Sequence, residues 1–90
     1  MAAKVALVTG GSSGIGEAAA VKLHELGYTT YAAARRVQRM EHLTQAGIRP
    51  LAMDVTDDES LRSGVKHILA EQGRIDVLVN GAGYGSYGAI

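Results

Sequence analysis

Residues 9–16 place four glycines between an apolar run and an alanine-rich run, and this segment constrains the fold of the whole chain. The apolar run at residues 5–8 predicts a strand, and residues 17–26 predict a helix. Glycine lets a backbone approach an anion closely, and a helix N-terminus presents unpaired N–H groups and a partial positive charge. A strand, a glycine turn and a helix in this order therefore indicate an anion-binding turn.

Two other interpretations of this turn remain open at this point. A P-loop, which binds nucleoside triphosphates, needs Lys and Ser or Thr after its second glycine, whereas Glu17 and Ala18 follow Gly16. The second alternative is a glycine turn that binds no ligand, and the turn by itself does not exclude it. Only the rest of the chain can separate these interpretations.

Composition and charge narrow the class of protein. The 90 residues are 47% hydrophobic and 20% charged, which is typical of a small globular domain or part of a larger one. Nine basic and nine acidic residues balance, so we expect no nucleic-acid or membrane partner. No cysteine is present and the three histidines lack metal-ligand spacing, so we expect no metal site and solvated histidines. A soluble, cytoplasmic protein is the expectation.

Apolar patterning predicts four strands that alternate with three helices. The predicted strands are residues 4–9, Thr29–Ala34, 48–54 and 75–79. The predicted helices are residues 14–26, a short helix that contains Leu43 and ends at Gly47, and a helix from residue 56 to Gly73. This alternation is typical of an α/β fold with a Rossmann-like, doubly wound parallel sheet.

Pro50 and the right-handedness of crossovers predict the strand order. Pro50 cannot donate a ladder hydrogen bond, which places the third strand at a sheet edge or makes Pro50 its first residue. Strands two and three added outward from strand one, with strand four on the other side, give the order 3-2-1-4. The first two helices then share one face and the third covers the other. The turns at residues 9–16 and 80–83 meet at the switch point, where such sheets bind ligands.

Several details of packing are also predicted. Gly64 inside the third helix indicates close packing there, and residues 56–59 predict a capping box with Thr56 as the cap. Met40 and Met53 are expected in or near the core. The predicted buried stripes are Ile15, Ala18, Ala19, Leu23 and Leu26 on the first helix, and Leu61, Val65, Ile68 and Leu69 on the third.

Three motifs, each at the end of a predicted strand, resemble the short-chain dehydrogenase/reductase family. Residues 9–16 match its TGxxxGIG cofactor loop, Asp54-Val55 lies where the family has an Asp that contacts adenine, and residues 80–83 are similar to its NNAG motif. The resemblance covers the whole chain and departs at Gly81, where the family usually has a second Asn. It implies a cofactor-binding Rossmann domain of an oxidoreductase that moves hydride between a nicotinamide and a carbonyl or alcohol. The residues that we predict to bind the dinucleotide at these motifs are Gly10, Ser12, Ser13, Gly14, Ile15, Gly16, Asp54, Val55, Asn80, Ala82 and Gly83.

Arg35 and Arg36, after the second strand, indicate the form of the cofactor. A site that prefers NAD places an acidic residue there to bind the ribose 2′-hydroxyl, and none is present. Arginine forks suit a 2′-phosphate, and one good contact would favour NADP by roughly tenfold to a hundredfold. The alternative is that both arginines are solvated at the start of a helix, where cations are poorly placed. We predict that both bind NADP and that NAD is less favoured.

The family's chemistry uses a Ser, a Tyr and a Lys, with the last two spaced Tyr-x-x-x-Lys. No tyrosine of this chain has a lysine four residues later. We therefore expect no catalytic residue here, an inactive chain on its own, and a small carbonyl or alcohol substrate bound only by a longer parent protein.

Residues 1–90 are interpreted as the N-terminal half of a single NAD(P)-binding domain, with the truncated order βαβαβαβ. The fourth strand would then be an exposed apolar edge, and we expect self-association. The alternative function is a non-catalytic dinucleotide-binding or self-assembling half-domain.

Overall fold

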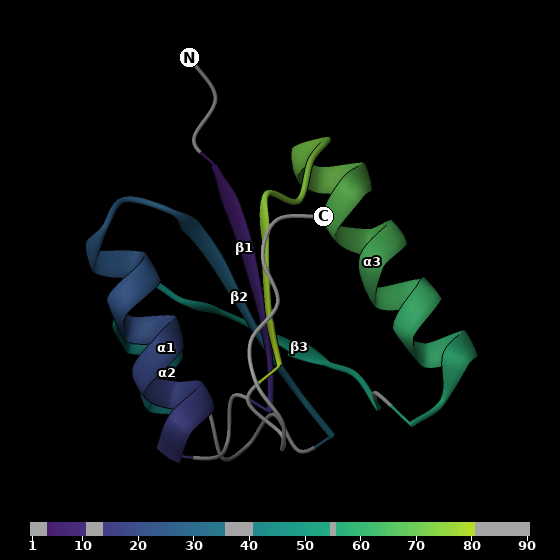
Figure 1. The fold of residues 1–90 in the computed structure, drawn as a ribbon, viewed down its shortest axis with the longest axis horizontal. Coiled ribbons are helices and arrows are strands. Elements are labelled where there is room, and N and C mark those ends of the chain that lie inside the picture. The colour runs from purple at the N-terminus through teal and green to yellow at the C-terminus, as the bar shows by residue number, and fades with distance from the viewer. Residues whose placement is uncertain (1–3, 11–13, 36–40, 55, 81–90) are drawn as a thin grey trace.

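The computed structural model describes residues 4–10, 14–35, 41–54 and 56–80 (Figure 1). The predicted alternation of strands and helices is confirmed, with boundaries that shift by a few residues. In chain order the elements are β1 (Val5–Thr9), α1 (Gly14–Glu25), β2 (Thr29–Ala34), α2 (Glu41–Gln45), β3 (Arg49–Ala52), α3 (Asp58–Gln72) and β4 (Val77–Asn80).

The four strands form one parallel sheet in the order β3-β2-β1-β4, as predicted. β3 is an edge strand, where Pro50 pairs with Ala32. An edge strand tolerates proline because only one of its sides has a neighbouring strand to receive N–H hydrogen bonds. At the other edge, β4 pairs only with β1 among the described strands. Because all strands run in the same direction, their carboxyl ends lie along one edge of the sheet.

The helices cover the two faces of the sheet as the crossover argument requires. α1 and α2 lie together on one face and α3 lies on the other (Figure 1). Alternate residues of each strand point to opposite faces, so each strand contributes to both cores. The core under α1 and α2 is built largely from small side chains, which are Val8, Ala20, Ala32, Ala34, Leu43 and Ile48. The core under α3 contains larger ones, which are Val5, Leu7, Tyr31, Ala33, Met53 and Ile68.

α3 packs closely on the sheet because of Gly64. A Cβ atom at this position would collide with Cε of Met53, which is buried, so the predicted close packing and the core position of Met53 are confirmed. Met40 lies outside the described residues. α3 ends at Gly73, whose φ of 79° is left-handed and whose backbone N donates to the Leu69 carbonyl oxygen at 2.8 Å.

The predicted capping box is wrong in its first residue. Asp57 caps α3, and its Oδ1 accepts from the backbone N of Glu59 at 3.0 Å. The Thr56 hydroxyl donates instead to the carboxylate of Asp54. An aspartate accepts hydrogen bonds at a helix N-terminus as well as a threonine does, and here the threonine has an anionic partner within the same turn.

Both predicted stripes are wrong at their margins. Leu26 is 62% exposed because it follows the end of α1 in the turn to β2, and Ala18 is exposed while Ala20 is buried. Leu69 is 44% exposed. Successive residues of a helix point in different directions around its axis, so Leu69 lies on the flank of α3 while its neighbour Ile68 is buried. The centres of both helices face the sheet as expected.

Candidate cofactor site

The carboxyl ends of β1 and β4 are neighbours at the edge of the sheet. Thr9, the last residue of β1, pairs with both Asn80 and Ala33 in the two adjacent strands. Its side chain is 3% exposed, and its Oγ1 donates to the carbonyl oxygen of Val79 at 3.3 Å. The backbone therefore brings the first residues of the first and third predicted binding motifs together. Ser12, Ser13, Ala82 and Gly83 lie outside the described residues.

The turn after β1 has a conformation that requires glycine at its start. Gly10 has a φ of 69°, in the left-handed region that side chains rarely adopt. Gly14 and Ile15 then begin α1, and Gly16 is buried in its first turn. The N-terminus of a 12-residue helix thus follows a buried strand within a few residues, as an anion-binding turn requires.

Arg35 follows β2 directly and is exposed at the same edge. The end of β2 carries no acidic residue, because its last three residues are alanines. The positive charge of Arg35 is close enough to Asp54 to contribute to that residue's lowered pKa. Arg36 lies outside the described residues.

Asp54 follows β3 by two residues and is half-buried. Its Oδ1 accepts from Thr56 Oγ1 at 2.6 Å and from Thr56 N at 3.0 Å, and its own backbone N donates to Ser60 Oγ at 2.9 Å. These bonds stabilise the anion: the Thr56 hydroxyl, then the Thr56 N–H, hold the pKa of the Asp54 carboxyl below its ordinary value of 3.8. Val55 lies outside the described residues.

The sequence analysis missed several polar contacts close to this edge. Thr56 was assigned only as a cap, although the spacing Asp-x-Thr is itself a signal for a hydrogen-bonded turn. Ser60 lies six residues from Asp54 and gives no comparable signal, because the contact depends on where α3 begins.

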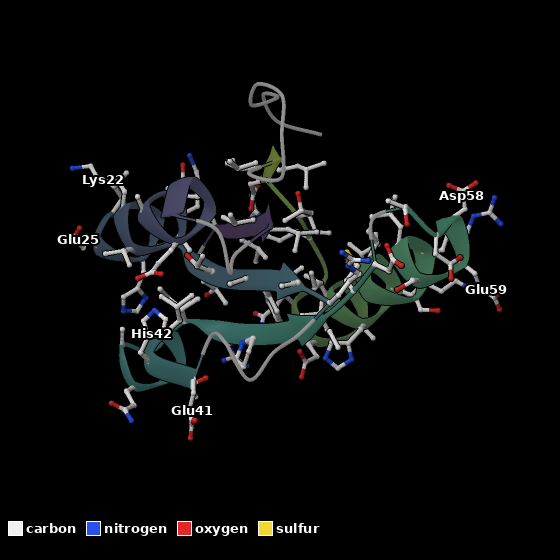
Figure 2. The ribbon with its side chains drawn as sticks, turned by 90° about the horizontal axis from the view of Figure 1, so that it is seen from below. Lys22, Glu25, Glu41, His42, Asp58 and Glu59 are labelled. Carbon is white, nitrogen blue, oxygen red and sulfur yellow. The ribbon has the colours of Figure 1, made fainter. Side chains whose placement is uncertain are left out.

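Two histidines that were expected to be merely solvated contact glutamates. His42 Nε2 lies 2.9 Å from Oε1 of Glu17, near the start of α1, and His67 Nε2 lies 3.2 Å from Oε1 of Glu71. Figure 2 shows His42 on the side of α2 that faces α1, whereas Glu41 points away from it. His67 and Glu71 are an i,i+4 pair within α3, so their spacing is a local signal for this contact. The contact of His42 with Glu17 joins two helices and has no local pattern that would predict it.

Neither a metal-binding cluster nor a membrane-spanning helix is present in the described ranges. No group of three or more His, Asp or Glu side chains there could hold a metal ion. None of the helices in those ranges has the length and apolar character needed to cross a membrane.

A family model described as short chain dehydrogenase matches residues 4–90. The chain belongs to the short-chain dehydrogenase family. It spans less than half the length of the relatives described next.

Three relatives illustrate the similarity. The chain is 41% identical over 90 residues to a 3-ketodihydrosphingosine reductase of Bacteroides thetaiotaomicron, covering 100% of this chain and 32% of that protein. It is 43% identical over 84 residues to an NADPH-dependent 1-acyldihydroxyacetone phosphate reductase of Schizosaccharomyces pombe, covering 91% and 28%. A crystal structure of a metagenomic short-chain oxidoreductase in complex with NADP superposes with a TM-score of 0.81 at 38% identity, covering 93% of this chain and 40% of that one.

Proposed function

We propose that this chain is the NADP(H)-binding portion of a short-chain oxidoreductase, which transfers hydride between a nicotinamide and a carbonyl or alcohol substrate. The observation that carries the proposal is Arg35, exposed directly after β2 at the carboxyl edge of the sheet and close to Asp54. At this position an NAD-specific site has an acidic residue. The NADP complex and the NADPH-dependent reductase among the relatives support the same cofactor.

Each part of the dinucleotide has a proposed set of residues. The residues that would bind the pyrophosphate follow β1, because a helix N-terminus attracts anions, and they are Gly10, Ser12, Ser13, Gly14, Ile15 and Gly16. The guanidinium groups of Arg35 and Arg36 would bind the 2′-phosphate, and Asp54 and Val55 the adenine. The remaining residues proposed to bind the cofactor belong to the third motif, and they are Asn80, Ala82 and Gly83.

The donor set fits this cofactor on the charges that the structure shows. The end of β2 carries no acidic residue, so the cation that follows it suits a phosphate, and an ionised carboxylate after β3 suits an amino group of a base. The cofactor supplies the hydride, and the chain's own residues bind and orient it. We propose that the residues that transfer the substrate proton lie outside residues 1–90, so that this chain alone binds cofactor without turning over substrate.

One observation favours a second function, a non-catalytic half-domain that self-associates. β4 lies at a sheet edge of the described residues, and its apolar side chains Val77, Leu78 and Val79 are only half-buried. Sedimentation of the chain at micromolar concentration tests this alternative, since a stable monomer would contradict it.

Calorimetric titration with NADPH and NADH tests the main proposal. We expect the chain to prefer NADPH by roughly tenfold to a hundredfold, and Arg35→Asp to remove that preference. Lys22→Asp is a matched control, because it makes the same change of charge at an exposed position further along α1 (Figure 2). Equal affinity for both cofactors would contradict the NADP assignment, and binding of neither would contradict the proposed function.

A further inference from the structure

The turn after β3 fixes Asp54 through two residues that belong to none of the three motifs. Ser60, in the first turn of α3, accepts from the Asp54 backbone N at 2.9 Å. Thr56 donates twice to the carboxylate Oδ1, from its backbone N at 3.0 Å and from its hydroxyl at 2.6 Å. Both the main chain of Asp54 and one of its carboxylate oxygens are therefore held in place.

Asp54 lies at the carboxyl edge of the sheet, where the cofactor is proposed to bind, because it directly follows a segment that pairs with β2. The backbone N of Met53 donates to the carbonyl oxygen of Ala34 at 3.0 Å, so the pairing of β2 with β3 continues one residue beyond β3. Asp54 is the next residue, and Arg35 is the residue after Ala34. The carboxylate and the guanidinium group thus follow directly from two adjacent, hydrogen-bonded chain segments.

The second carboxylate oxygen of Asp54 has no hydrogen-bond donor in the part of the chain that the structure describes. Oδ1 accepts both hydrogen bonds from Thr56, and no described residue donates to Oδ2. An ionised carboxylate can only accept hydrogen bonds. It therefore attracts an amino group on a base and repels an oxo group at the same position. Adenine and hypoxanthine differ in this way, since adenine has an exocyclic amino group where hypoxanthine has an oxygen.

We propose that Thr56 and Ser60 are positioning residues for the adenine end of the cofactor, which hold Asp54 so that Oδ2 selects a base with an exocyclic amino group. This inference rests on the proposed function. It assigns roles to two side chains that contact Asp54 and need not contact the cofactor. Without the Thr56 hydroxyl, the carboxylate can rotate, and its preference between the two bases should weaken.

The test compares the affinities of NADPH and of its analogue in which hypoxanthine replaces adenine. Thr56→Val removes the hydroxyl and keeps the shape of the side chain, and we expect it to reduce the preference for NADPH roughly three- to tenfold. Thr56→Ser restores the donor and should keep the preference of the starting chain within about twofold. Thr44→Val, at an exposed threonine of α2, is the matched control and should leave the preference unchanged.

The ratio of the two affinities separates positioning from a merely structural role, which would weaken both cofactors equally. An unchanged ratio in Thr56→Val, with intact NADPH binding, would overturn this inference and leave the proposed function standing. Binding of neither cofactor by the starting chain would overturn both.

Two further measurements keep the inference testable if Thr56→Val folds poorly. Ser60→Ala removes the acceptor of the Asp54 backbone N, and it should reduce the same ratio. NMR titration of the Asp54 carboxyl without cofactor should show a higher pKa in Thr56→Val than in Thr56→Ser, because the hydroxyl stabilises the anion. Identical titration curves would contradict the role of the hydroxyl.

Discussion

Asp54 follows a strand at the carboxyl edge of the sheet, where the strands end, and Asp76 precedes a strand at the amino edge, where the strands begin. Hydrogen bonds from neighbouring residues stabilise both as anions. Asp76 precedes β4 at the amino edge, where its Oδ2 accepts from the backbone N of Val5 at 2.7 Å. Arg74 donates to it through Nε, at 3.1 Å to Oδ1 and 2.8 Å to Oδ2, and through Nη2 to Oδ1 at 2.5 Å. Both oxygens of Asp76 thus accept hydrogen bonds, whereas among the described residues only Oδ1 of Asp54 does.

The comparison shows that a hydrogen-bonded anion does not by itself indicate a binding site. The Arg74 guanidinium, then the Val5 N–H, hold the pKa of Asp76 below its ordinary value, as Thr56 does for Asp54. The two aspartates differ in how many of their carboxylate oxygens accept hydrogen bonds from the described residues. Asp76 joins the starts of β1 and β4, whereas Oδ2 of Asp54 accepts no hydrogen bond from the described residues. The contacts of Asp76 join parts of the fold at the amino edge, and the proposed cofactor site lies at the carboxyl edge.

α3 connects these two edges. Near its start, Ser60 accepts a hydrogen bond from the backbone of Asp54. Near its end, Glu71 Oε1 accepts from the Tyr31 hydroxyl at 2.7 Å, and Gln72 Nε2 donates to that hydroxyl at 3.2 Å. Burial, and then the hydrogen bond to the Glu71 carboxylate, raise the pKa of Tyr31 and keep it a donor. One helix therefore has a structural contact at one end and a contact with the site at the other.

The largest effect on stability is expected from Asp76→Ala. It leaves the backbone N–H of Val5, which is buried, without its acceptor, and it leaves Arg74 without its carboxylate. We expect the midpoint of thermal unfolding to fall by roughly 5 to 15 °C, as is typical for losing such a bond in a domain of this size. Circular dichroism on heating measures the shift.

Asp54→Ala is the matched control at the other edge. Water can replace its contacts with Thr56, which is exposed, so the midpoint should change by only about 2 °C while NADPH binds more weakly. A larger loss of stability in Asp54→Ala than in Asp76→Ala would break the comparison.

Gly64→Ala should destabilise the protein, because its new methyl group would collide with Met53. Overpacking costs about 1–3 kcal/mol and the gain in helix propensity is about 1 kcal/mol, so we expect a net destabilisation of up to about 2 kcal/mol. Ser63→Ala, at an exposed neighbour, should cost nothing comparable. Denaturant unfolding of both variants measures the difference.

Met53→Val provides the internal check on this explanation. Met53→Val shortens the side chain that would collide with the new methyl group of Gly64→Ala. The double variant should therefore lose less stability than the sum of the losses in the two single variants. Strictly additive costs would show that the contact with Met53 is not the cause.

Tyr31→Phe tests the amino edge alone. It removes the hydroxyl that bonds Glu71 and Gln72, and we expect a loss of about 1 kcal/mol in the free energy of unfolding. NADPH affinity should stay the same, because Tyr31 contacts the end of α3 that lies away from the proposed site. A change in affinity greater than about twofold would contradict the separation of the two edges.

The smallest expected effect is on how the stability of the fold changes with pH under acidic conditions. Because both aspartates have folded-state pKa values below 3.8, their contribution to stability is complete above that pH and is lost as the pH falls through the folded values. Asp76→Asn should flatten this dependence. Asp58→Asn, at an outward-pointing side chain near the start of α3 (Figure 2), is the control and should keep the slope of the starting chain. Equal slopes in all three proteins would contradict the role of Asp76.

Features of the sequence that involve backbone constraints predicted the fold well. Pro50 cannot donate to a ladder, which placed β3 at an edge, and Gly64 has no side chain, which indicated the close approach of α3. The glycines after the first strand predicted a tight turn, and Gly10 there has the left-handed φ of 69° that glycine allows. Such constraints act within a few residues, so one sequence is enough to recognise them.

Features that depend on side chains meeting across the fold were not predicted. The cap of α3 could be Thr56 or Asp57, and only the competing bond from Thr56 to Asp54 decides between them. The contacts of Ser60 with Asp54 and of His42 with Glu17 depend on how the helices are placed. The binding roles of the motif residues stay predictions, which the experiments above test.

An NMR titration of the chain with NADPH, observed through backbone amide signals, tests the division between the two edges most directly. The account predicts that the signals of Gly10, Gly16, Arg35 and Asp54 shift with a common dissociation constant. It also predicts that those of Glu71, Arg74 and Asp76 stay in place. Larger shifts at the amino edge than at the carboxyl edge would contradict the account.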